Sequence, residues 1–488
     1  MTGLRAFLRR PWATVVLGAV AALLVVGAGW AFLPGPTTTP DAEPVVEPVA
    51  SAELLCPITV ATDALVSTVS AGVAPVPGVA DGTATLATLS QDASGAQKPI
   101  AAPGSVVTDT ISRKPSSPRI ARATGSWAAG FGADQTARSG QGASRGLAVS
   151  PCARPLTDGW LVGGSSAVGR QMQVLLVNDD DRPSQVDLLV YGTDGEIASP
   201  AGSGVVVPAL SRSVVRLAAL APGQSITAVH VVARSGRIAV SALETAANGL
   251  TPLGMSALPV TQPSRTVVIP DIPAVRDAHL LLLAPDDDAT ATVRLLTADG
   301  AITPVGLESV ALDREHLRSL SLTDALAGGA AGVVVTADTP VVAAVVMTAG
   351  GTTATFTEME TTAGTAALTA PGIVVGLAAG SVRHGVGLAA PTDDAVVRLD
   401  VYAAGSTSPV STRTVTVTGG TSVRVPVAVT QPGAMLVVTP VSGGPVYATR
   451  ELTELGSRGF MLALAPILPL RASTTVPPVA QVPGSSLS

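Results

Sequence analysis

Three acidic clusters are the most regular polar feature of the sequence. They occupy residues 179–181, 286–288 and 393–394, and their leading residues, Asp179, Asp286 and Asp393, recur every 107 residues. Carboxylate oxygens are ligands that calcium prefers, but calcium takes about six to eight of them and each cluster is a single short turn. The alternative is that these Asp side chains accept hydrogen bonds in turns between strands. We favour the turns and predict no metal site.

The four histidines, His230, His279, His316 and His384, are scattered along the chain. None stands in an HExxH motif or beside a cysteine, so the sequence gives no support for a zinc site. Neither lysine follows a glycine, as a phosphate-binding loop requires. We therefore predict no catalytic residue, no cofactor and no enzymatic activity.

A wall hydrolase is the enzymatic alternative, because the paired carboxylates of a glycosidase meet in space and not in sequence. Carbohydrate-active clefts usually offer several aromatic rings, whereas aromatic residues make up 2% of this chain. Trp160 could stack on a sugar ring. The interpretation we favour for Trp160 is packing in a core or between domains.

Cys56 and Cys152 are the only cysteines. An even number of cysteines outside the membrane predicts a disulfide. A loop of this length is stabilised by about 4–5 kcal/mol in the chain-entropy model. A catalytic cysteine is the alternative, but no histidine motif accompanies either residue.

Residues 113–145 are rich in Ser and Gly and carry six basic residues against one acidic residue. We interpret this segment as a loop. As a functional surface it would meet anionic wall polymers or lipid headgroups. The candidate interaction residues are Arg113, Lys114, Arg119, Arg122 and Trp127. The alternative is a solvated loop without a partner.

The elements that carry these residues are predicted to be short strands. Hydrophobic residues make up 47% of the chain and charged residues 13%, and Val and Thr, which suit a pleated sheet, are abundant. Val397, Leu399 and Val401 alternate with Arg398, Asp400 and Tyr402, so the first set faces a core and the second faces out. Six or seven such strands in each 107-residue unit are typical of an immunoglobulin-like β-sandwich.

The domain organisation follows from this pattern. We predict three tandem β-sandwich repeats at residues 160–262, 263–370 and 371–472, preceded by an N-terminal β region at 51–159. That region either stands alone or completes the first repeat. Residues 473–488 are predicted to be a disordered tail.

The N-terminus predicts a membrane anchor. A basic tail at 1–11 precedes an uncharged apolar run at 12–33, which is long enough to cross a bilayer as a helix. The flanking charge places the N-terminus in the cytoplasm, and a cleaved signal peptide is the alternative. A Pro- and Thr-rich stalk at 34–50 follows. The net charge of −6 argues against a nucleic-acid partner.

The segment RGLAVSPCARPLTDGWLVGGSSAVGRQMQVLLVNDDD (145–181) and the motif LLCP (54–57) resemble an actinobacterial family of membrane-anchored exported proteins of unknown function. The matching features are the cysteine segment, the Trp-Leu-Val-Gly-Gly stretch and the Asn-Asp end of the following strand. Members are often encoded near an envelope glycosyltransferase. The resemblance therefore implies work in the cell envelope, but it identifies no catalytic residue.

These observations together predict a mainly β, single-pass membrane protein with its bulk outside the cytoplasm. The function we expect is a non-enzymatic scaffold or accessory subunit in cell-envelope assembly, with a membrane glycosyltransferase as partner. A module that binds wall polymer or glycan is the alternative.

Overall fold

The computed structural model describes residues 12, 15–16, 18–21, 45–58, 64–90, 97–112, 116–350, 357–456 and 459–476. The chain divides into one compact unit made of Met1–Glu47 with Thr475–Ser488 and another made of Pro48–Thr474. No helix within the described ranges is long and apolar enough to span a bilayer. The predicted basic tail, most of the predicted span at 12–33 and residues 34–44 of the stalk lie outside the described residues.

The two ends of the described chain pair with each other. Strand β1 (Val45–Pro48) joins β36 (Ser473–Val476) in a two-stranded sheet, and the Val49 amide donates to the Ala472 carbonyl at 3.0 Å. The prediction of a disordered tail is therefore wrong for residues 473–476, which find a strand partner. The remainder of that tail, 477–488, lies outside the described residues.

The described part of the unit Pro48–Thr474 forms four modules. Module 1 consists of β2 (Ser51–Cys56), β3 (Leu65–Val73), β4 (Gly82–Thr88), β5 (Gln97–Ile100), β6 (Val106–Ile111), β7 (Arg119–Gly125), the 3-10 helix η1 (Ser126–Gly130), β8 (Phe131–Ser139) and β9 (Gly146–Pro151). Module 2 consists of β10 (Asp158–Val162), β11 (Arg170–Asn178), β12 (Ser184–Gly192), β13 (Gly195–Ile197), η2 (Pro200–Gly202), β14 (Val205–Val207), β15 (Ser211–Arg216), α3 (Leu217–Leu220), β16 (Ala228–Ser235), β17 (Ala239–Asn248), β18 (Thr251–Leu258) and β19 (Val260–Thr261).

The same plan continues toward the C-terminus. Module 3 consists of β20 (Ser264–Ile272), β21 (Asp277–Leu283), β22 (Ala289–Thr297), β23 (Gly300–Ile302), β24 (Val310–Leu312), β25 (Arg318–Ser321), α4 (Thr323–Leu326), β26 (Ala331–Ala349) and β27 (Glu358–Ala363). Module 4 consists of β28 (Gly372–Leu377), β29 (Val382–Ala390), β30 (Ala395–Tyr402), β31 (Ser411–Val417), β32 (Thr421–Val427), β33 (Ala434–Gly443), β34 (Tyr447–Gly456) and β35 (Gly459–Pro466).

All four modules share one strand order. The first sheet has the order β2-β7-β4-β5 in module 1, and its counterparts contain β10-β16-β12-β13, β20-β26-β22-β23 and β28-β33-β30-β31. The second sheet has the order β6-β3-β8-β9, with counterparts β15-β11-β17-β18, β25-β21-β26-β27 and β32-β29-β34-β35. In module 3 the long strand β26 belongs to both sheets. The N-terminal β region is thus a module of the same kind as the three predicted repeats.

The strand order differs from the immunoglobulin arrangement that we predicted. In immunoglobulin domains the first strand lies beside the second, and the seventh beside the sixth. Here the first strand pairs with the sixth, as β2 does with β7, and the second strand pairs with the seventh, as β3 does with β8. The chain is mainly β and its modules have two sheets, but their strands are connected differently from those of an immunoglobulin domain.

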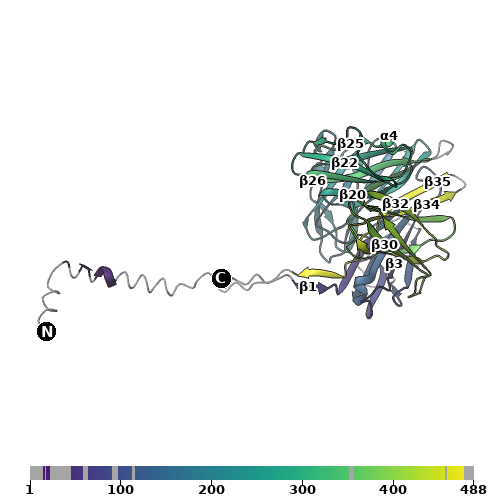
Figure 1. Ribbon diagram of the computed structural model, residues 1–488, viewed down its shortest axis with the longest axis horizontal. Helices are drawn as coiled ribbons and strands as arrows, with labels where there is room; N and C mark the ends of the chain where they lie inside the picture. The colour runs from purple at the N-terminus through teal and green to yellow at the C-terminus, as the bar shows by residue number, and fades with distance from the viewer. Residues whose placement is uncertain are drawn as a thin grey trace. The chain divides into compact units, whose positions relative to one another are not determined.

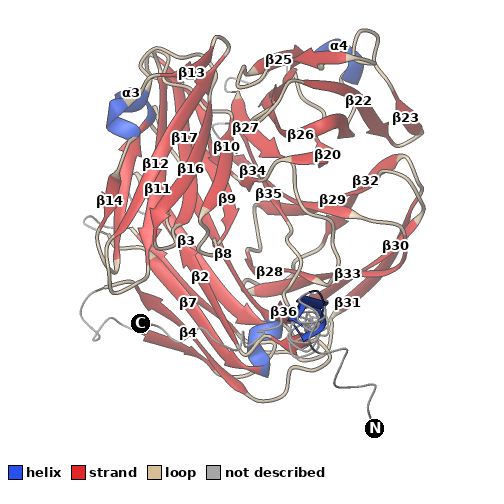
Figure 2. Ribbon diagram, turned by 90° about the vertical axis from the view of Figure 1, so that its left-hand side faces the viewer, coloured by secondary structure: helices blue, strands red, loops and turns tan. Residues whose placement is uncertain are grey.

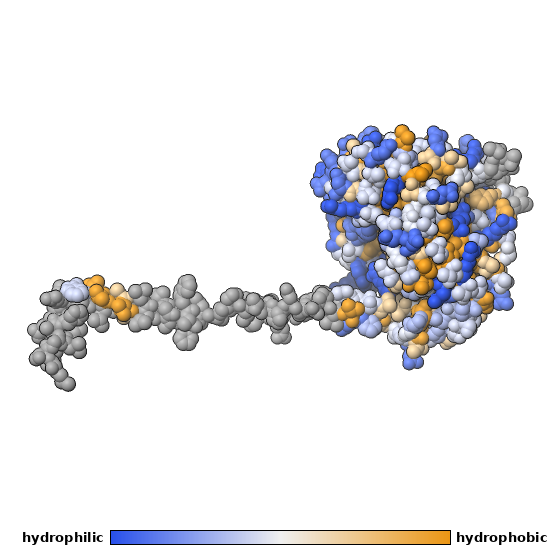
Figure 3. All heavy atoms as spheres, viewed as in Figure 1, coloured by the Kyte–Doolittle hydropathy of each residue, from blue (hydrophilic) through white to orange (hydrophobic). Residues whose placement is uncertain are grey.

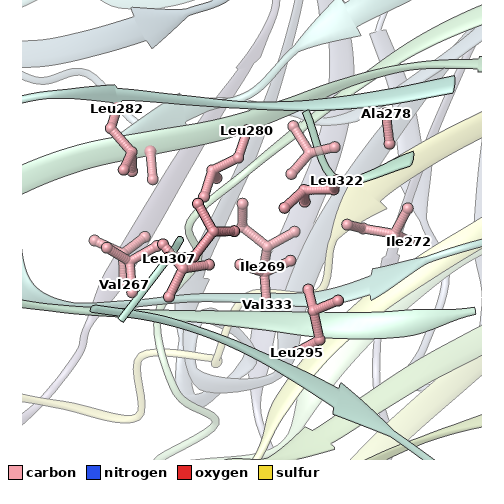
Figure 4. Packing of buried hydrophobic residues seen from close by; sticks show 14 of the residues in the cluster. Val267, Ile269, Ile272, Ala278, Leu280, Leu282, Leu295, Leu307, Leu322 and Val333 are labelled. Carbon is pink, nitrogen blue, oxygen red and sulfur yellow. The ribbon is translucent and has the colours of Figure 1, made fainter. Parts of the chain in front are cut away.

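Each module encloses a hydrophobic core between its two sheets, which is aliphatic in modules 2, 3 and 4 and includes Trp127 and Phe131 in module 1. In module 3, Leu280 and Leu282 of the second sheet face Val267, Ile269 and Val333 of the first sheet (Figure 4). All five side chains are buried. Burying one such side chain contributes about 1.5–3 kcal/mol, so aliphatic residues replace the missing aromatic rings.

The four modules close into a ring, because the first sheet of each packs on the second sheet of the next. This explains why two of the three residues of β30 that we predicted to face out are buried: Asp400 and Tyr402 are only 3% and 7% exposed. Arg398, the third, is exposed as predicted. Four apolar contacts close the ring, one at each seam. Leu55 and Ile120 of module 1 meet Val177 and Ala239 of module 2, and Trp160 and Tyr191 of module 2 meet Leu281 and Leu283 of module 3. Val268 and Leu296 of module 3 meet Ala389 of module 4, and Tyr402 and Met435 of module 4 meet Ala74 of module 1.

The last strand of the second sheet in each module, β9, β18, β27 or β35, lies at the centre of the ring, where it contacts its counterparts from the neighbouring modules. Figure 2 labels β9, β27 and β35 there. The labelled strands of the four modules surround this centre in Figure 2, and Figure 1 labels strands of modules 1, 3 and 4 from another side. Glycine permits the close approach, since a Cβ on Gly146 of β9 would lie 2.5 Å from the Met255 nitrogen of β18. On the face seen in Figure 3, polar and apolar residues are interspersed.

Candidate functional site

A cavity of about 660 Å³, which we call the central pit, lies where the segments between the modules meet. Its lining comes from residues 150–156, 258–264, 266–267 and 364–367 and from 466 and 468–471 at the end of β35 and beyond it, together with other strand residues. Every module therefore contributes to one concave surface. Cavities of about 300–1,000 Å³ are typical of small-molecule sites.

Proline shapes the wall of the central pit. Proline fixes its own φ and has no N–H to donate, so it ends a strand and holds the next segment in a fixed path. The prolines that line the pit are Pro151, Pro155, Pro259, Pro263, Pro466 and Pro469. They lie at or just after the ends of β9, β18 and β35, so three of the four modules end in a similar way at the pit.

Two arginines give the central pit a positive charge. Arg154 and Arg471 both line it, and neither has an ion-pair partner among the residues that the structure describes. Burial lowers the pKa of Arg154, and the positive charge of Arg471 lowers that pKa further. Two like charges therefore lie close together without compensation from the described protein.

Asp134 is an acidic residue of the pit lining, but its charge is already compensated. It is 8% exposed, its Oδ2 accepts the Val375 amide at 2.7 Å, and its Oδ1 lies 3.7 Å from Nη1 of the buried Arg450. Burial raises the pKa of Asp134, while Arg450 acts in the opposite direction. The two unpaired arginines thus determine the sign of the potential in the pit.

Hydroxyl groups supply the remaining polar chemistry. Tyr447 lines the pit, and burial raises its pKa, so its hydroxyl stays protonated and can donate. The hydroxyls of Ser241 and Thr365 also belong to lining residues, are buried, and have no hydrogen-bond partner within the described structure. The pit could therefore hold an anion at the arginines and hydroxyl-bearing groups beside it.

A second polar cluster lies between the four central strands. Glu358 and Glu360 project from the same face of β27, and both are fully buried. Glu360 Oε1 accepts from the Ser256 hydroxyl at 2.7 Å and the Thr361 amide at 3.0 Å, whereas its Oε2 has no partner among the described atoms. Burial raises the pKa of Glu360 well above 4.5. Burial therefore favours the protonated form of Glu360, which is a hydrogen-bonded core residue.

Glu358 differs from Glu360 because a cation lies near it. Its Oε1 accepts the Leu147 amide at 3.2 Å, and its Oε2 lies 3.6 Å from Nη1 of the buried Arg145. Burial raises the pKa of Glu358 to about 8, against the opposing effects of Leu147 and Arg145. Through these contacts, the cluster joins β27 to β9.

The structure contains the disulfide between Cys56 and Cys152, with a Cα–Cα distance of 4.6 Å. Both cysteines belong to the core of module 1. Cys152 also lines the central pit. The disulfide therefore fixes the segment that carries Arg154 to the end of β2.

The prediction that residues 113–145 form a basic loop is wrong for the described part of this segment. Among residues 116–145 the structure has two strands and a 3-10 helix, because Ala121 and Ala123 face the core of the module and Ile120 faces the seam with module 2. Trp127 is also part of that core, 8% exposed, and donates to the Ala80 carbonyl at 3.2 Å, so it offers no interaction surface.

The predicted interaction residues do not gather at one site. Arg119 is paired with Asp109 at 2.5 Å and Arg122 with Glu53 at 2.5 Å. Arg113 and Lys114 lie outside the described residues.

The acidic clusters lie in turns between strands, where two of their aspartates accept hydrogen bonds from backbone amides. Asp288 Oδ1 accepts the Arg314 amide and Asp394 Oδ1 accepts the Gly419 amide, each at 2.8 Å. The described residues contain no group of three or more His, Cys, Asp or Glu side chains placed to hold a metal ion. Trp160 is 2% exposed and packs in the seam between modules 2 and 3, stacked on His230 at a ring distance of 4.2 Å.

Sequence reasoning missed Arg154, Arg471 and the buried glutamates. The repeated prolines of the segments between modules were the available signal for the pit. Sequence reasoning also passed over a GxSxG sequence at 142–146. A nucleophile elbow of that type joins a strand to a helix, but here the sequence joins β8 to β9.

No curated protein matches this sequence. Residues 106–428 match the model of a family described as a family of unknown function, DUF5719. The match begins at β6 in module 1 and ends just after β32 in module 4, so it includes modules 2 and 3 entirely. Since it covers more than half of the chain, the protein belongs to this family.

Proposed function

We propose that the protein is an exported, membrane-tethered, non-enzymatic scaffold or accessory subunit of cell-envelope assembly, and that the central pit is its binding surface. The observation that carries this proposal is that all four modules contribute to one cavity. A rigid closed ring holds such a surface in a fixed geometry, which is the property that a scaffold requires.

Two further features support the cellular setting of the proposal. The Cys56–Cys152 disulfide is typical of an oxidising compartment outside the cytoplasm. The uncharged run at 12–33 after a basic start is typical of an anchor with a cytoplasmic N-terminus. The resemblance to actinobacterial envelope proteins favours a membrane glycosyltransferase as the partner.

The location can be tested with single cysteines in a cell that expresses the full chain. Leu250 is 91% exposed in the turn between β17 and β18, so Leu250→Cys should react with a membrane-impermeant maleimide on intact spheroplasts. Gly3→Cys is the matched control and should react only after permeabilisation. Equal protection of both cysteines before permeabilisation would refute export.

The partner can be tested by crosslinking in cells, followed by recovery of the full-length chain. Residues 1–50 alone serve as the control for the anchor. Recovery of one membrane enzyme with the full chain alone supports the accessory-subunit proposal. Recovery of wall polymer without an enriched protein contradicts it and favours a glycan-binding module.

A further inference from the structure

We propose that the central pit binds a phosphate monoester carried on a group the size of a sugar or a lipid, with Arg154 and Arg471 as the ligands of the phosphate. This inference deepens the proposed function, since it rests on the pit being a binding surface and names the chemical class that the surface takes.

The charge of the pit is the first argument. A guanidinium remains protonated in proteins, so Arg154 and Arg471 place two positive charges in one cavity wall. Asp134 cannot neutralise them because it faces Arg450 and the Val375 amide. Arg154 is half-buried and Arg471 is exposed, and an anion bound by both would offset their repulsion.

The geometry of the donors is the second argument. A guanidinium presents a planar fork that bonds phosphate or carboxylate oxygens in pairs. A phosphate monoester carries a charge of about −1.5 to −2 at neutral pH and has three strong acceptor oxygens. Two arginines match that charge, whereas a single carboxylate would leave one of them uncompensated.

The lining beside the arginines is the third argument, and it indicates an organic group on the phosphate. Leu156, Leu468 and Leu470 line the same cavity, and Leu468 is 45% exposed although it is apolar. Tyr447 adds a hydroxyl donor. A phosphate ion alone would leave most of the roughly 660 Å³ to water and would not cover these leucines.

Calorimetric titration of the full-length protein in phosphatidylcholine nanodiscs tests the inference. Glucose 1-phosphate and dihexanoyl phosphatidic acid distinguish a sugar from a lipid as the carrier, and glucose is the uncharged control. We expect binding of at least one phosphate monoester, weaker binding at higher ionic strength, and no binding of glucose.

Substitutions assign the phosphate to the two arginines. Arg154→Gln and Arg471→Gln should each weaken binding by about tenfold or more, because each removes charge-assisted hydrogen bonds, and the double variant should not bind. Arg413→Gln, at an exposed position on β31 away from the pit, should bind like the wild type. If a glutamine variant fails to fold, Arg154→Lys and Arg471→Lys keep the charge and should show an intermediate loss.

The results separate this inference from the proposed function. Absence of binding for both monoesters, or equal binding by the wild type and the double variant, overturns the phosphate site. If crosslinking still recovers the same membrane partner in that case, the scaffold proposal stands. Phosphate binding without any recovered partner supports the site and contradicts the accessory-subunit role.

Discussion

The Glu358 carboxyl group should make the stability of the ring depend on pH. Its side chain is fully buried between the central strands, where Arg145 and Glu360 are the ionisable neighbours that affect it. Burial raises the pKa of Glu358 from its usual 4.5 to about 8. The informative change is Glu358→Gln, which keeps the shape of the side chain and cannot lose a proton.

The pH window and the magnitude follow from these two pKa values. Between pH 4.5 and 8 the unfolded chain has released the Glu358 proton while the folded ring retains it, so the free energy of unfolding falls as the pH rises. The contribution is complete below pH 4.5 and lost above pH 8. At 1.36 kcal/mol per pH unit, the full difference is about 5 kcal/mol.

Urea denaturation from pH 4.5 to 8.5, followed by the fluorescence of Trp127 and Trp160, measures this effect. At pH 4.5 the stability of Glu358→Gln should lie within about 1 kcal/mol of the wild type, and its advantage should grow by up to about 5 kcal/mol toward pH 8.5. Glu196→Gln, at an exposed position on β13, is the control and should show no such trend. A constant difference between Glu358→Gln and the wild type over this range would refute the reasoning, because Glu358 would then be ionised and paired with Arg145.

Three further changes test other parts of the ring. Cys56→Ser should lower the free energy of unfolding by about 2–5 kcal/mol by urea denaturation, since it opens a cross-link between residues 96 apart; an unchanged midpoint would contradict this. Gly146→Ala places a Cβ 2.5 Å from the Met255 backbone nitrogen and should lower the melting temperature. Gly385→Ala, whose Cβ has its nearest contact at 3.6 Å, is the control and should not. Equal effects of the two substitutions would argue against the close approach of β9 and β18. Burial lowers the pKa of His384 from 6.5 to about 4, so stability should fall by up to about 3 kcal/mol as the pH drops from 6.5 to 4, and His384→Gln should remove that part of the decline.

The sequence revealed three modules because their second and third strands are joined by similar acidic turns. Residues 179–183, 284–288 and 391–394 make these connections. In module 1 the same connection spans residues 74–81, contains two prolines and has no acidic pair. The fourth copy of the fold was therefore hidden by the turn, although its strands have the same order.

Strand alternation predicted which residues face the core of a module but not what covers the opposite face. Val397, Leu399 and Val401 are buried in module 4 as their spacing requires. Tyr402 faces the other side and is nevertheless buried, because module 1 packs there. Alternation is a property of one sheet, whereas ring closure depends on how whole sheets meet, and no local pattern encodes that.

The central pit was unpredictable for the same reason. Arg154 follows the first module and Arg471 follows the fourth, and only closure of the ring brings them to one cavity. Neither residue belongs to a motif, and each follows a strand in a segment that sequence patterns classify simply as a connection.

Module 1 contributes one contact to the closure of the ring and another to the wall of the pit. Arg138 of module 1 binds both carboxylate oxygens of Glu454 in module 4, at 2.7 and 2.6 Å, across the seam where the chain ends meet. The Cys56–Cys152 disulfide anchors the segment of Arg154 in module 1. Reduction of the disulfide should therefore weaken phosphate binding in the pit at urea concentrations that leave the cores of modules 2 and 3 folded. Equal affinity of the oxidised and reduced protein would mean that strand pairing alone, such as the Leu55 amide with the Ala153 carbonyl at 2.8 Å, holds Arg154 in place.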